Sequence, residues 1–168
     1  MLIYMGIFEK PHVLDRKFRG EVKAKGYEGW IALQSAQLGT NRNITTSTGR
    51  GTNREASAPT TQEIVITKLQ DSVSTALYRE TLDGEGKLIV IAFVKEDGTS
   101  YTTIVLQNTL ISSYSVSGHG GGVTDSRPTE SLSINFTKIT FEMSPTSPNT
   151  THSQVYNLSQ QATWESSF

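Results

Sequence analysis

Residues 86–95 (GKLIVIAFVK) constrain the fold more than any other segment. Their apolar side chains alternate between two faces, with Leu88, Val90, Ala92 and Val94 on one face and Ile89, Ile91 and Phe93 on the other. This period of two predicts a β-strand, and apolar residues on both faces require cover on both sides. The segment is therefore expected to lie inside a fold of two layers.

The acidic turn 96–99 (Glu96-Asp97-Gly98-Thr99) follows this strand and precedes another run of alternating residues at 101–116. An Asp-Gly step between two such runs is a strong β-hairpin signal, because glycine adopts the backbone conformations that tight turns need. In the second run, four apolar residues share one parity and are expected to face the core: Ile104, Leu106, Leu110 and Tyr114.

Four more segments resemble strands: 2–8, 30–38, 63–68 and 131–143. Within the last of these, apolar positions change parity, from Leu132, Ile134 and Phe136 to Ile139, Phe141 and Met143. A parity change indicates either a bulge or a strand whose covered face switches midway. Six or more strands favour a mainly β fold, a compact β-barrel or two-sheet sandwich.

A short α-helix is predicted at about residues 72–82. Asp71 is placed to cap its first turn, and Gly84 can adopt the left-handed conformation that ends many helices. The apolar stripe of Val73, Ala76 and Leu77 is narrow. We therefore expect the helix to lie on a sheet, with Leu77 as a packing residue.

The chain of 168 residues is expected to form a single domain, with a core at about 1–143 and a polar C-terminal tail at 144–168. Residues 39–62 are polar and show no apolar periodicity. Typical loops have about four to six residues, so this long extended loop either is disordered or lies against something. A second exposed loop is expected around the glycine-rich segment 118–122.

No residue pattern indicates catalysis, a cofactor or a metal site. Cysteine is absent, and His12, His119 and His152 stand in separate contexts without a partner at metal-ligand spacing. Neither 47–51 nor 118–122 leads from a strand into a helix with a Gly-Lys-Ser/Thr triplet, so a phosphate loop is not expected. Serine is abundant, but no Gly-x-Ser-x-Gly motif is present. The chain is predicted not to be an enzyme.

Charge and hydropathy also limit the partners. With 15 basic and 16 acidic residues, the net charge of -1 gives no overall attraction to nucleic acid or an anionic membrane. No apolar run is long enough to span a bilayer, and MLIYMGIFEK lacks the features of a signal peptide.

Three segments resemble a known family. Residues 67–77 (TKLQDSVSTAL) are similar to a strand-to-helix passage, with Thr75 where many members have proline, and 110–114 (LISSY) is similar to a Val-Ser-Ser-Tyr strand. The most specific match is 128–139 (PTESLSINFTKI), which resembles Pro-Thr-Glu-Ser-Val-Ser-Leu-Asn-Phe-Ala-Lys-Ile at nearly every position. In this order the segments resemble the haemolysin-coregulated protein (Hcp) family, which forms the tube of type VI secretion systems.

More weakly, 30–39 is similar to the family's second strand and 47–54 to its extended loop. Residues 9–19 look like an insertion, and Ala36-Gln37-Leu38 replaces the usual aromatic pair.

The resemblance implies a β-barrel-like domain related to phage tail-tube proteins. It implies subunits that form rings, usually of six, which stack into a tube inside a sheath, below a spike, and carry effectors in the lumen. Such a protein is made in the bacterial cytoplasm and is secreted without a signal peptide. The loop residues implied in assembly are Thr48, Gly49, Arg50, Gly51 and Arg54, and Gln37 is expected to face the lumen.

Two other interpretations stay open from the sequence. A tail-tube subunit of another phage-like contractile injection system would share the fold and the role. A carbohydrate- or ligand-binding β-sandwich would use Trp30, Tyr101 and Trp164 as a stacking platform, although aromatic residues so far apart more often pack in cores or cover edges.

Overall fold

The structure is a computed structural model that describes residues 1–46, 54–56, 60–120, 127–143, 152–157 and 165–167, with side chains within 1–44, 60–120 and 127–143. The strands are β1 (Leu2–Lys10), β2 (Val13–Leu14), β3 (Ile31–Leu33), β4 (Ser35–Gln37), β5 (Thr40–Asn41), β6 (Ile44–Thr46), β7 (Arg54–Ala56), β8 (Thr60–Thr61), β9 (Ile64–Leu69), β10 (Lys87–Val94), β11 (Ser100–Ser117), β12 (Thr129–Asn135), β13 (Lys138–Met143), β14 (His152–Asn157) and β15 (Glu165–Ser167). The helices are the 3-10 helix η1 (Arg16–Phe18) and the α-helix α1 (Ser74–Asp83).

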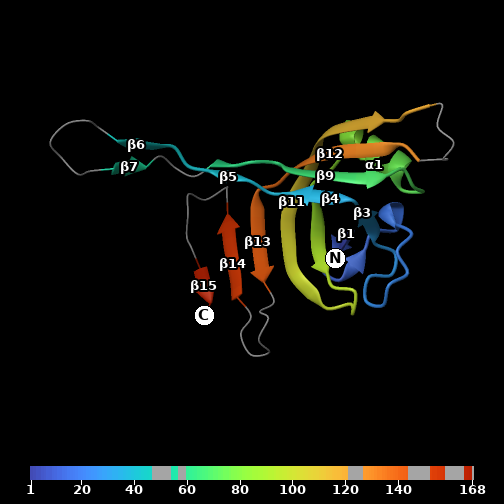
Figure 1. Cartoon of the computed structure of the whole chain (residues 1–168), viewed down its shortest axis with the longest axis horizontal. Helices are drawn as coiled ribbons and strands as arrows, with labels where there is room; N and C mark the ends of the chain where they lie inside the picture. Colours follow the sequence, from blue (N-terminus) through green and yellow to red (C-terminus); the bar gives the residue numbers. More distant parts are fainter. Residues whose placement is uncertain (47–53, 57–59, 121–126, 144–151, 158–164, 168) are drawn as a thin grey trace.

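The strands form two layers that share the long strand β11 (Figure 1). Sheet A has the order β15-β14-β13-β11-β10-β1-β2, with β3 also paired to β1. Sheet B contains β4, β9, β12 and the second half of β11. All of these pairs are antiparallel. The predicted mainly β sandwich with a short helix is confirmed, and the described strands do not close into a barrel within one subunit.

Two predicted strands are in fact pairs of strands that cross from one layer to the other. The segment 30–38 breaks at Gln34, so that β3 pairs with β1 in sheet A and β4 pairs with β9 in sheet B. The segment 131–143 breaks at residues 136–137, between β12 in sheet B and β13 in sheet A. The parity change read from the sequence marks this crossing, because the core lies on opposite sides of the two layers.

Strand β11 crosses between the layers through a bulge and not through a break. Asn108 has a φ of 50°, and the register with β10 shifts between Lys87 and Ile89. Thr109 and Ile111 therefore face inward, while Leu110 is 48% exposed. The prediction that Leu110 faces the core is wrong, because the bulge inserts a residue and reverses the parity.

The hairpin between β10 and β11 is confirmed. Gly98 has a φ of 89°, and the turn is closed by a hydrogen bond from Lys95 N to Thr99 O of 2.8 Å. The Asp97 carboxylate accepts hydrogen bonds from Thr99 N at 2.9 Å and from Thr99 Oγ1. These hydrogen bonds hold the pKa of Asp97 below its ordinary value. Asp97 thus has a structural role in the turn.

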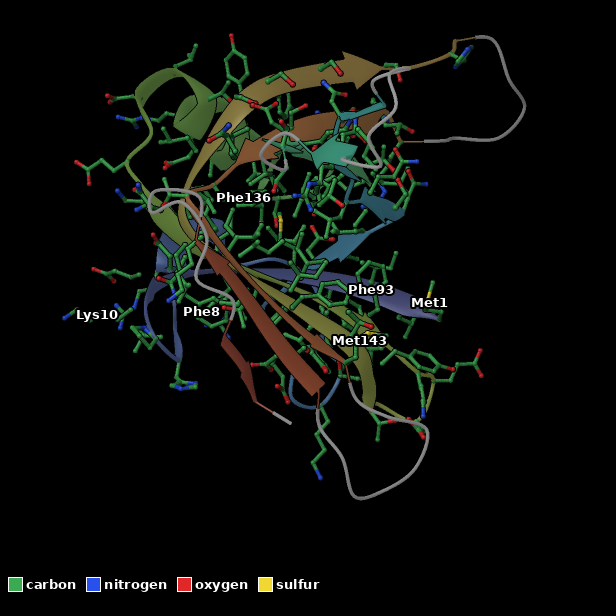
Figure 2. The ribbon with its side chains drawn as sticks, turned by 90° about the vertical axis from the view of Figure 1, so that its left-hand side faces the viewer. Met1, Phe8, Lys10, Phe93, Phe136 and Met143 are labelled. Atoms are coloured by element: carbon green, nitrogen blue, oxygen red, sulfur yellow. The ribbon has the colours of Figure 1, made fainter. Side chains whose placement is uncertain are left out.

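The core lies between the layers, and strand β10 is covered on both faces as predicted. One face contributes Ile89 and Ile91 to the main cluster, and the other contributes Ala92 and Val94 to a smaller cluster. Phe136 lies between the layers at the crossing from β12 to β13, and Met1 and Lys10 mark opposite ends of β1 (Figure 2).

Helix α1 lies against β11, and Leu77 is fully buried in the main cluster, as expected. Asp71 accepts a hydrogen bond from Val73 N at 3.0 Å, and its own N–H donates to Ser74 Oγ at 2.9 Å. Asp71 therefore stabilises the turn before the helix, but the predicted cap is wrong, because the N-cap is Val73 and it has no side-chain cap hydrogen bond. The left-handed end at Gly84 is wrong: its φ is -83° and its ψ is 144°, which is extended backbone.

Residues 9–19, which look like an insertion, close one end of the core. They form the turn at His12 (φ 65°), strand β2 and helix η1, and they bury Phe18 in the main cluster. The buried Asp15 accepts from Lys17 N at 3.0 Å and pairs with Lys87 Nζ at 3.3 Å. The segment is therefore an integral part of the fold.

The polar segment 39–62 forms a two-stranded ribbon in its described parts. β5 pairs with β8, and β6 pairs with β7. Gln62 N donates to Gly39 O at 2.9 Å at the base of the ribbon. Figure 1 shows these strands extending away from the body. We call residues 39–62 the arm. It is an extended segment, as predicted, but its described strands are paired and not structureless.

Two strands lie within the segment that the sequence presents as a polar tail. β14 pairs with β13, and β15 pairs with β14, so the backbone extends sheet A beyond residue 143.

Candidate assembly surfaces

A buried network of charged and polar side chains connects sheet B to helix α1. Lys68 and Glu130 are both fully buried, and Lys68 Nζ lies 2.9 Å from Glu130 Oε2 and 2.8 Å from Asp71 Oδ1. Lys68 Nζ also donates to Leu69 O at 2.8 Å, and the Tyr114 hydroxyl donates to Glu130 Oε1 at 2.8 Å. Every charge in the network therefore has several partners.

The surroundings of the network determine its protonation. Burial opposes ionisation of Glu130, but hydrogen bonds from Lys68, Ser74 and Tyr114 and the charge of Lys68 outweigh it and lower the pKa of Glu130. Burial, followed by the hydrogen bond to Glu130 and its negative charge, raises the pKa of Tyr114. Glu130 therefore remains ionised and Tyr114 remains a hydrogen-bond donor near neutral pH.

This network contains one or more residues from each of the three family-like segments. Lys68 and Asp71 come from 67–77, Tyr114 from 110–114 and Glu130 from 128–139. Lys68 and Glu130 are opposite each other in the register of β9 and β12. A buried ion pair contributes little net stability but strongly disfavours arrangements that leave either charge unpaired. We infer that the motifs preserve the register of sheet B.

Sequence reasoning did not assign these roles to Lys68 and Glu130, although a signal was present. In β9, Lys68 shares the parity of Ile64 and Ile66, which are buried. A lysine at a core position of an alternating strand requires a buried acidic partner.

Two edges of sheet B are open in the described part of the subunit. β4 pairs with β9 on one side only, and residues 110–117 of β11 pair with β12 on one side only. The two edges lie on opposite sides of the sheet, which has the order β4-β9-β12-β11. Unpaired strand edges offer rows of backbone donors and acceptors to another chain.

The β11 edge is accompanied by exposed apolar side chains. Leu110 and Val116 on β11 are 48% and 52% exposed, and Tyr78 and Leu82 on α1 are 53% and 70% exposed. The rings of Tyr78 and Tyr114 pack edge to face with centroids 5.5 Å apart. Leu82 and Leu110 also line a common hollow of about 440 Å³. This combination of an open edge and apolar side chains is typical of a protein interface.

Of the predicted site residues, the structure describes the side chain of only one, Gln37. Gln37 is exposed at the end of β4, opposite Val65 of β9. Thr48, Gly49, Arg50 and Gly51 lie outside the described residues, and Arg54 is described only as backbone in β7. Their roles in assembly stay predictions.

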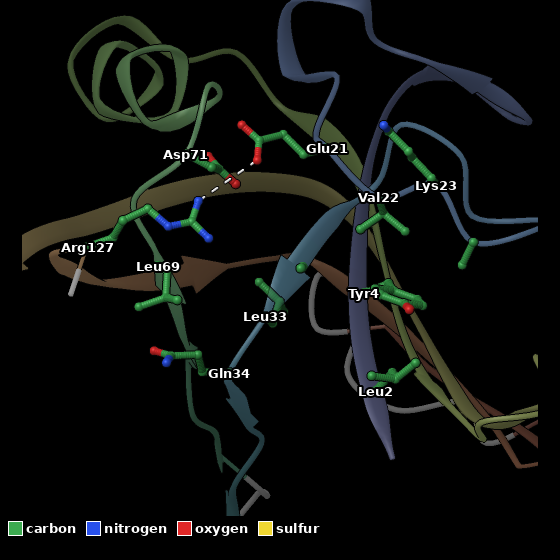
Figure 3. A pocket seen from close by; sticks show the side chains of 12 residues that line it. Leu2, Tyr4, Glu21, Val22, Lys23, Leu33, Gln34, Leu69, Asp71 and Arg127 are labelled. Atoms are coloured by element: carbon green, nitrogen blue, oxygen red, sulfur yellow. Dashed lines mark ion pairs between the residues drawn. The ribbon is translucent and has the colours of Figure 1, made fainter. Parts of the chain in front are cut away.

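A separate groove of about 370 Å³ lies beside β3, between the start of β1 and the end of β9 (Figure 3). Tyr4 and Leu2 line one part of it, and Glu21 and Arg127 form a loose ion pair of 3.9 Å at another. Its lining mixes apolar residues with both signs of charge.

Trp30 packs against its neighbours and does not form part of an exposed stacking platform. Its ring lies 5.6 Å from that of Phe8 and 5.1 Å from that of Tyr27, centroid to centroid, with edge-to-face geometry in both cases. Tyr101 instead lies under Lys95 Nζ, 4.8 Å from the ring centroid, and Trp164 lies outside the described residues.

Among the described residues, no three His, Asp or Glu side chains form a group that could hold a metal ion. His12 and His119 are exposed. No helix within the described ranges has the length and apolar character needed to cross a membrane.

These features define a class of protein: a mainly β sandwich subunit with open sheet edges and a projecting arm, suited to assembly with copies of itself. The chain belongs to the family described as type VI secretion system effector, Hcp, whose model matches residues 4–143. It is a subunit of the type VI secretion tube. The family consists of secreted structural proteins and is not an enzyme family.

Solved structures of low sequence identity share the fold. A type six secretion system protein is 19% identical with a TM-score of 0.83, over 96% of this chain and 98% of that chain. Hcp1 from Salmonella typhimurium is 15% identical with a TM-score of 0.73, over 94% and 95%. The secreted protein Hcp3 from Pseudomonas aeruginosa is 21% identical with a TM-score of 0.54, over 90% and 95%. Direct comparison with curated protein sequences finds no match.

Proposed function

We propose that this chain assembles into closed rings of six subunits, which stack into the inner tube of a type VI secretion system. The tube carries effector proteins, is surrounded by a sheath and is tipped by a spike. In this proposal the subunit is folded in the bacterial cytoplasm and leaves the cell through the machine itself. Its role is mechanical, with no chemical step.

The observation that carries this proposal is the pair of open edges on sheet B. If β11 of one subunit meets β4 of the next, each subunit fills the open edge of its neighbour. Such a contact joins two different surfaces, so it repeats around an axis until the ring closes. Closure removes every open edge of sheet B, which disfavours uncontrolled aggregation.

The arm supports the stacking of rings. It extends from the body as a ribbon that continues β4 and β9, and it carries Arg42, Arg50 and Arg54 against one acidic residue, Glu55. A long ribbon gains stability when it lies against another surface. We propose that the arm binds the adjacent ring, with Gly49 and Gly51 allowing close backbone approach and the arginines forming charge-assisted hydrogen bonds.

Substitutions at the β11 edge test the ring. We expect Leu110→Lys combined with Val116→Lys to convert rings to monomers in native mass spectrometry, because lysine on an edge opposes strand pairing. Both positions are about half exposed in the isolated subunit, so the thermal midpoint of the monomer should change little.

Tyr101→Lys is the matched control. Tyr101 is 43% exposed but lies in the half of β11 that has strands on both sides. Rings that survive the edge substitutions, or that are lost equally in the control, would disprove this mode of closure.

A further inference from the structure

In the described part of the subunit one face of sheet B is uncovered, and side chains alternate between the two faces along β9 and β12. In β9, Ile64, Ile66 and Lys68 are buried, while the residues between them are half-buried. In β12 the same alternation places Glu130, Leu132 and Ile134 inside. The outward residues of the four strands are Ser35, Gln37, Val65, Thr67, Leu69, Leu110, Ser113, Ser115, Ser117, Thr129, Ser131, Ser133 and Asn135.

These outward residues form rows that run across the strands. One row consists entirely of hydroxyl side chains, in the order Ser115, Ser131, Thr67 and Ser35. Ser35 Oγ and Thr67 Oγ1 are 2.6 Å apart, and Ser115 Oγ donates to Ser131 O at 3.5 Å. We call this row the hydroxyl row.

None of the outward residues carries a charge. Lys68 and Glu130 lie on the opposite, buried face of these strands, and the nearest charged residues on the outward face are at its two ends. Glu63 precedes β9 at one end, where it accepts hydrogen bonds from Ser112 and Asn135. Arg127 precedes β12 at the other end. The six residues of β9 correspond to roughly 20 Å at about 3.3 Å per residue, so a wide neutral zone separates the two charged ends.

The position of this face in a ring follows from the proposed function, on which this inference rests. If sheet B continues from subunit to subunit, one of its faces must line the hole and the other must face outward. Sheet A and helix α1 cover the buried face. Because these bulky parts fit only outside the closed sheet, the uncovered face lines the lumen. Each row then becomes a belt around the axis.

We propose that the hydroxyl row forms a neutral belt of serine and threonine around the lumen, which contacts protein cargo by hydrogen bonds and does not discriminate by the sign of its charge. Hydroxyl groups both donate and accept hydrogen bonds, so they match varied polar surfaces. A charged residue at one of these positions would be repeated in every subunit and would form a ring of charge, as in ion-selective pores.

Charge substitutions in the belt test this inference. Ser131→Glu and Ser131→Lys place rings of opposite charge in the lumen. Thr75→Glu and Thr75→Lys are the matched controls, because Thr75 is exposed on α1, on the covered side of sheet B. The probes are two fluorescent ten-residue peptides, one rich in lysine and one rich in glutamate, measured by fluorescence anisotropy against rings at low salt.

For unsubstituted rings we expect the two peptides to bind equally within about threefold, or both to bind too weakly to measure. Ser131→Glu should bind the lysine-rich peptide at least tenfold more tightly than Thr75→Glu does, and Ser131→Lys should favour the glutamate-rich peptide in the same way. The gain should disappear at 1 M salt, where the Debye length is about 3 Å.

The inference is overturned if unsubstituted rings prefer one peptide by tenfold or more, or if the Ser131 variants gain no more than the Thr75 variants. Native mass spectrometry is carried out first on each variant. Failure of the unsubstituted protein to form rings would disprove the proposed function, whereas intact rings with the wrong peptide preference would disprove only the neutral belt.

Discussion

At the scale of single residues, the least expected feature is a lysine without solvent exposure inside the core of a mainly β fold. Lys68 is balanced by Glu130 and Asp71, at 2.9 and 2.8 Å. Removing water from both charges costs about as much as their attraction returns, so the pair selects a register more than it adds stability. The effects of substituting the two residues on the free energy of unfolding should therefore be strongly non-additive.

We expect Lys68→Met alone to lower the free energy of unfolding by roughly 3–5 kcal/mol, because it leaves Glu130 buried without its cation. Combining Lys68→Met with Glu130→Leu should recover most of this loss. Urea unfolding of the two single variants and the double variant, under conditions that keep all of them monomeric, measures the coupling. Additive losses would show that the two side chains do not act as a pair.

The same network predicts acid sensitivity. The pKa of Glu130 is lowered in the folded state, so the unfolded state binds more protons at acidic pH. The stabilisation is fully present above the unfolded glutamate pKa of about 4.3 and is lost as the pH falls from there through the lower folded pKa. Glu130→Gln should flatten this part of the curve of unfolding free energy against pH. Glu142→Gln, at an exposed position, is the control and should leave it unchanged.

At the scale of elements, segment 9–19, which looks like an insertion in the sequence, forms part of the core. Phe18 is 2% exposed, and Lys87 Nζ lies 5.9 Å from its ring centroid. The adjacent Asp15 pairs with Lys87 at the start of β10. Helix η1 thus covers the end of the core where β1 and β10 leave it open.

Truncation of the Phe18 side chain should destabilise the fold. We expect Phe18→Ala to lower the free energy of unfolding by roughly 3–5 kcal/mol, the usual cost of deleting a buried aromatic ring. Val13→Ala in the same segment is the control, because Val13 is 51% exposed and should change stability little. Chemical denaturation measures both variants. An equal, small effect in both would mean that the segment is only peripheral.

At the scale of the whole molecule, the subunit divides into a closed body and surfaces that need a partner. In the body, the strands of sheet A are paired and the apolar side chains are packed in the core. The edges of sheet B are open, and the arm extends away from the body. The hydrogen bond from Gln62 N to Gly39 O closes the base of the arm, so the arm can be removed without opening the body.

We therefore expect replacement of residues 40–61 by Asn-Gly, which forms tight two-residue hairpin turns, to preserve the fold. Rings should still form, because their edges are in the body, but tubes should shorten or disappear in electron micrographs. Thermal unfolding of the monomer and native mass spectrometry of the rings provide the controls. If tubes of normal length still form, the arm is not needed for ring stacking.

Local sequence patterns by themselves determined four features. Alternation of apolar residues determined the mainly β class and the two-sided cover of β10, the Asp-Gly step determined the β10–β11 hairpin, and helical spacing determined the buried Leu77. These features depend on local patterns, because strand and helix periodicity are properties of neighbouring residues. The motifs also located Lys68, Tyr114 and Glu130 in the sequence without showing that they meet. They meet because β9 pairs with β12 and β12 pairs with β11. This pairing brings Tyr114 and Glu130, each more than 40 positions from Lys68 in the sequence, into one network with it.

Only the tertiary structure decided where strands change layers. The breaks at Gln34 and at 136–137 and the bulge at Asn108 each follow from which neighbour a strand finds. A one-residue shift reverses the side that faces the core, and for this reason Leu110 is exposed although its sequence parity pointed inward. Gly84 likewise ends α1 in an extended conformation, because the chain must turn directly into β10. Local sequence sets the periodicity of a strand, but long-range pairing sets the face that is buried.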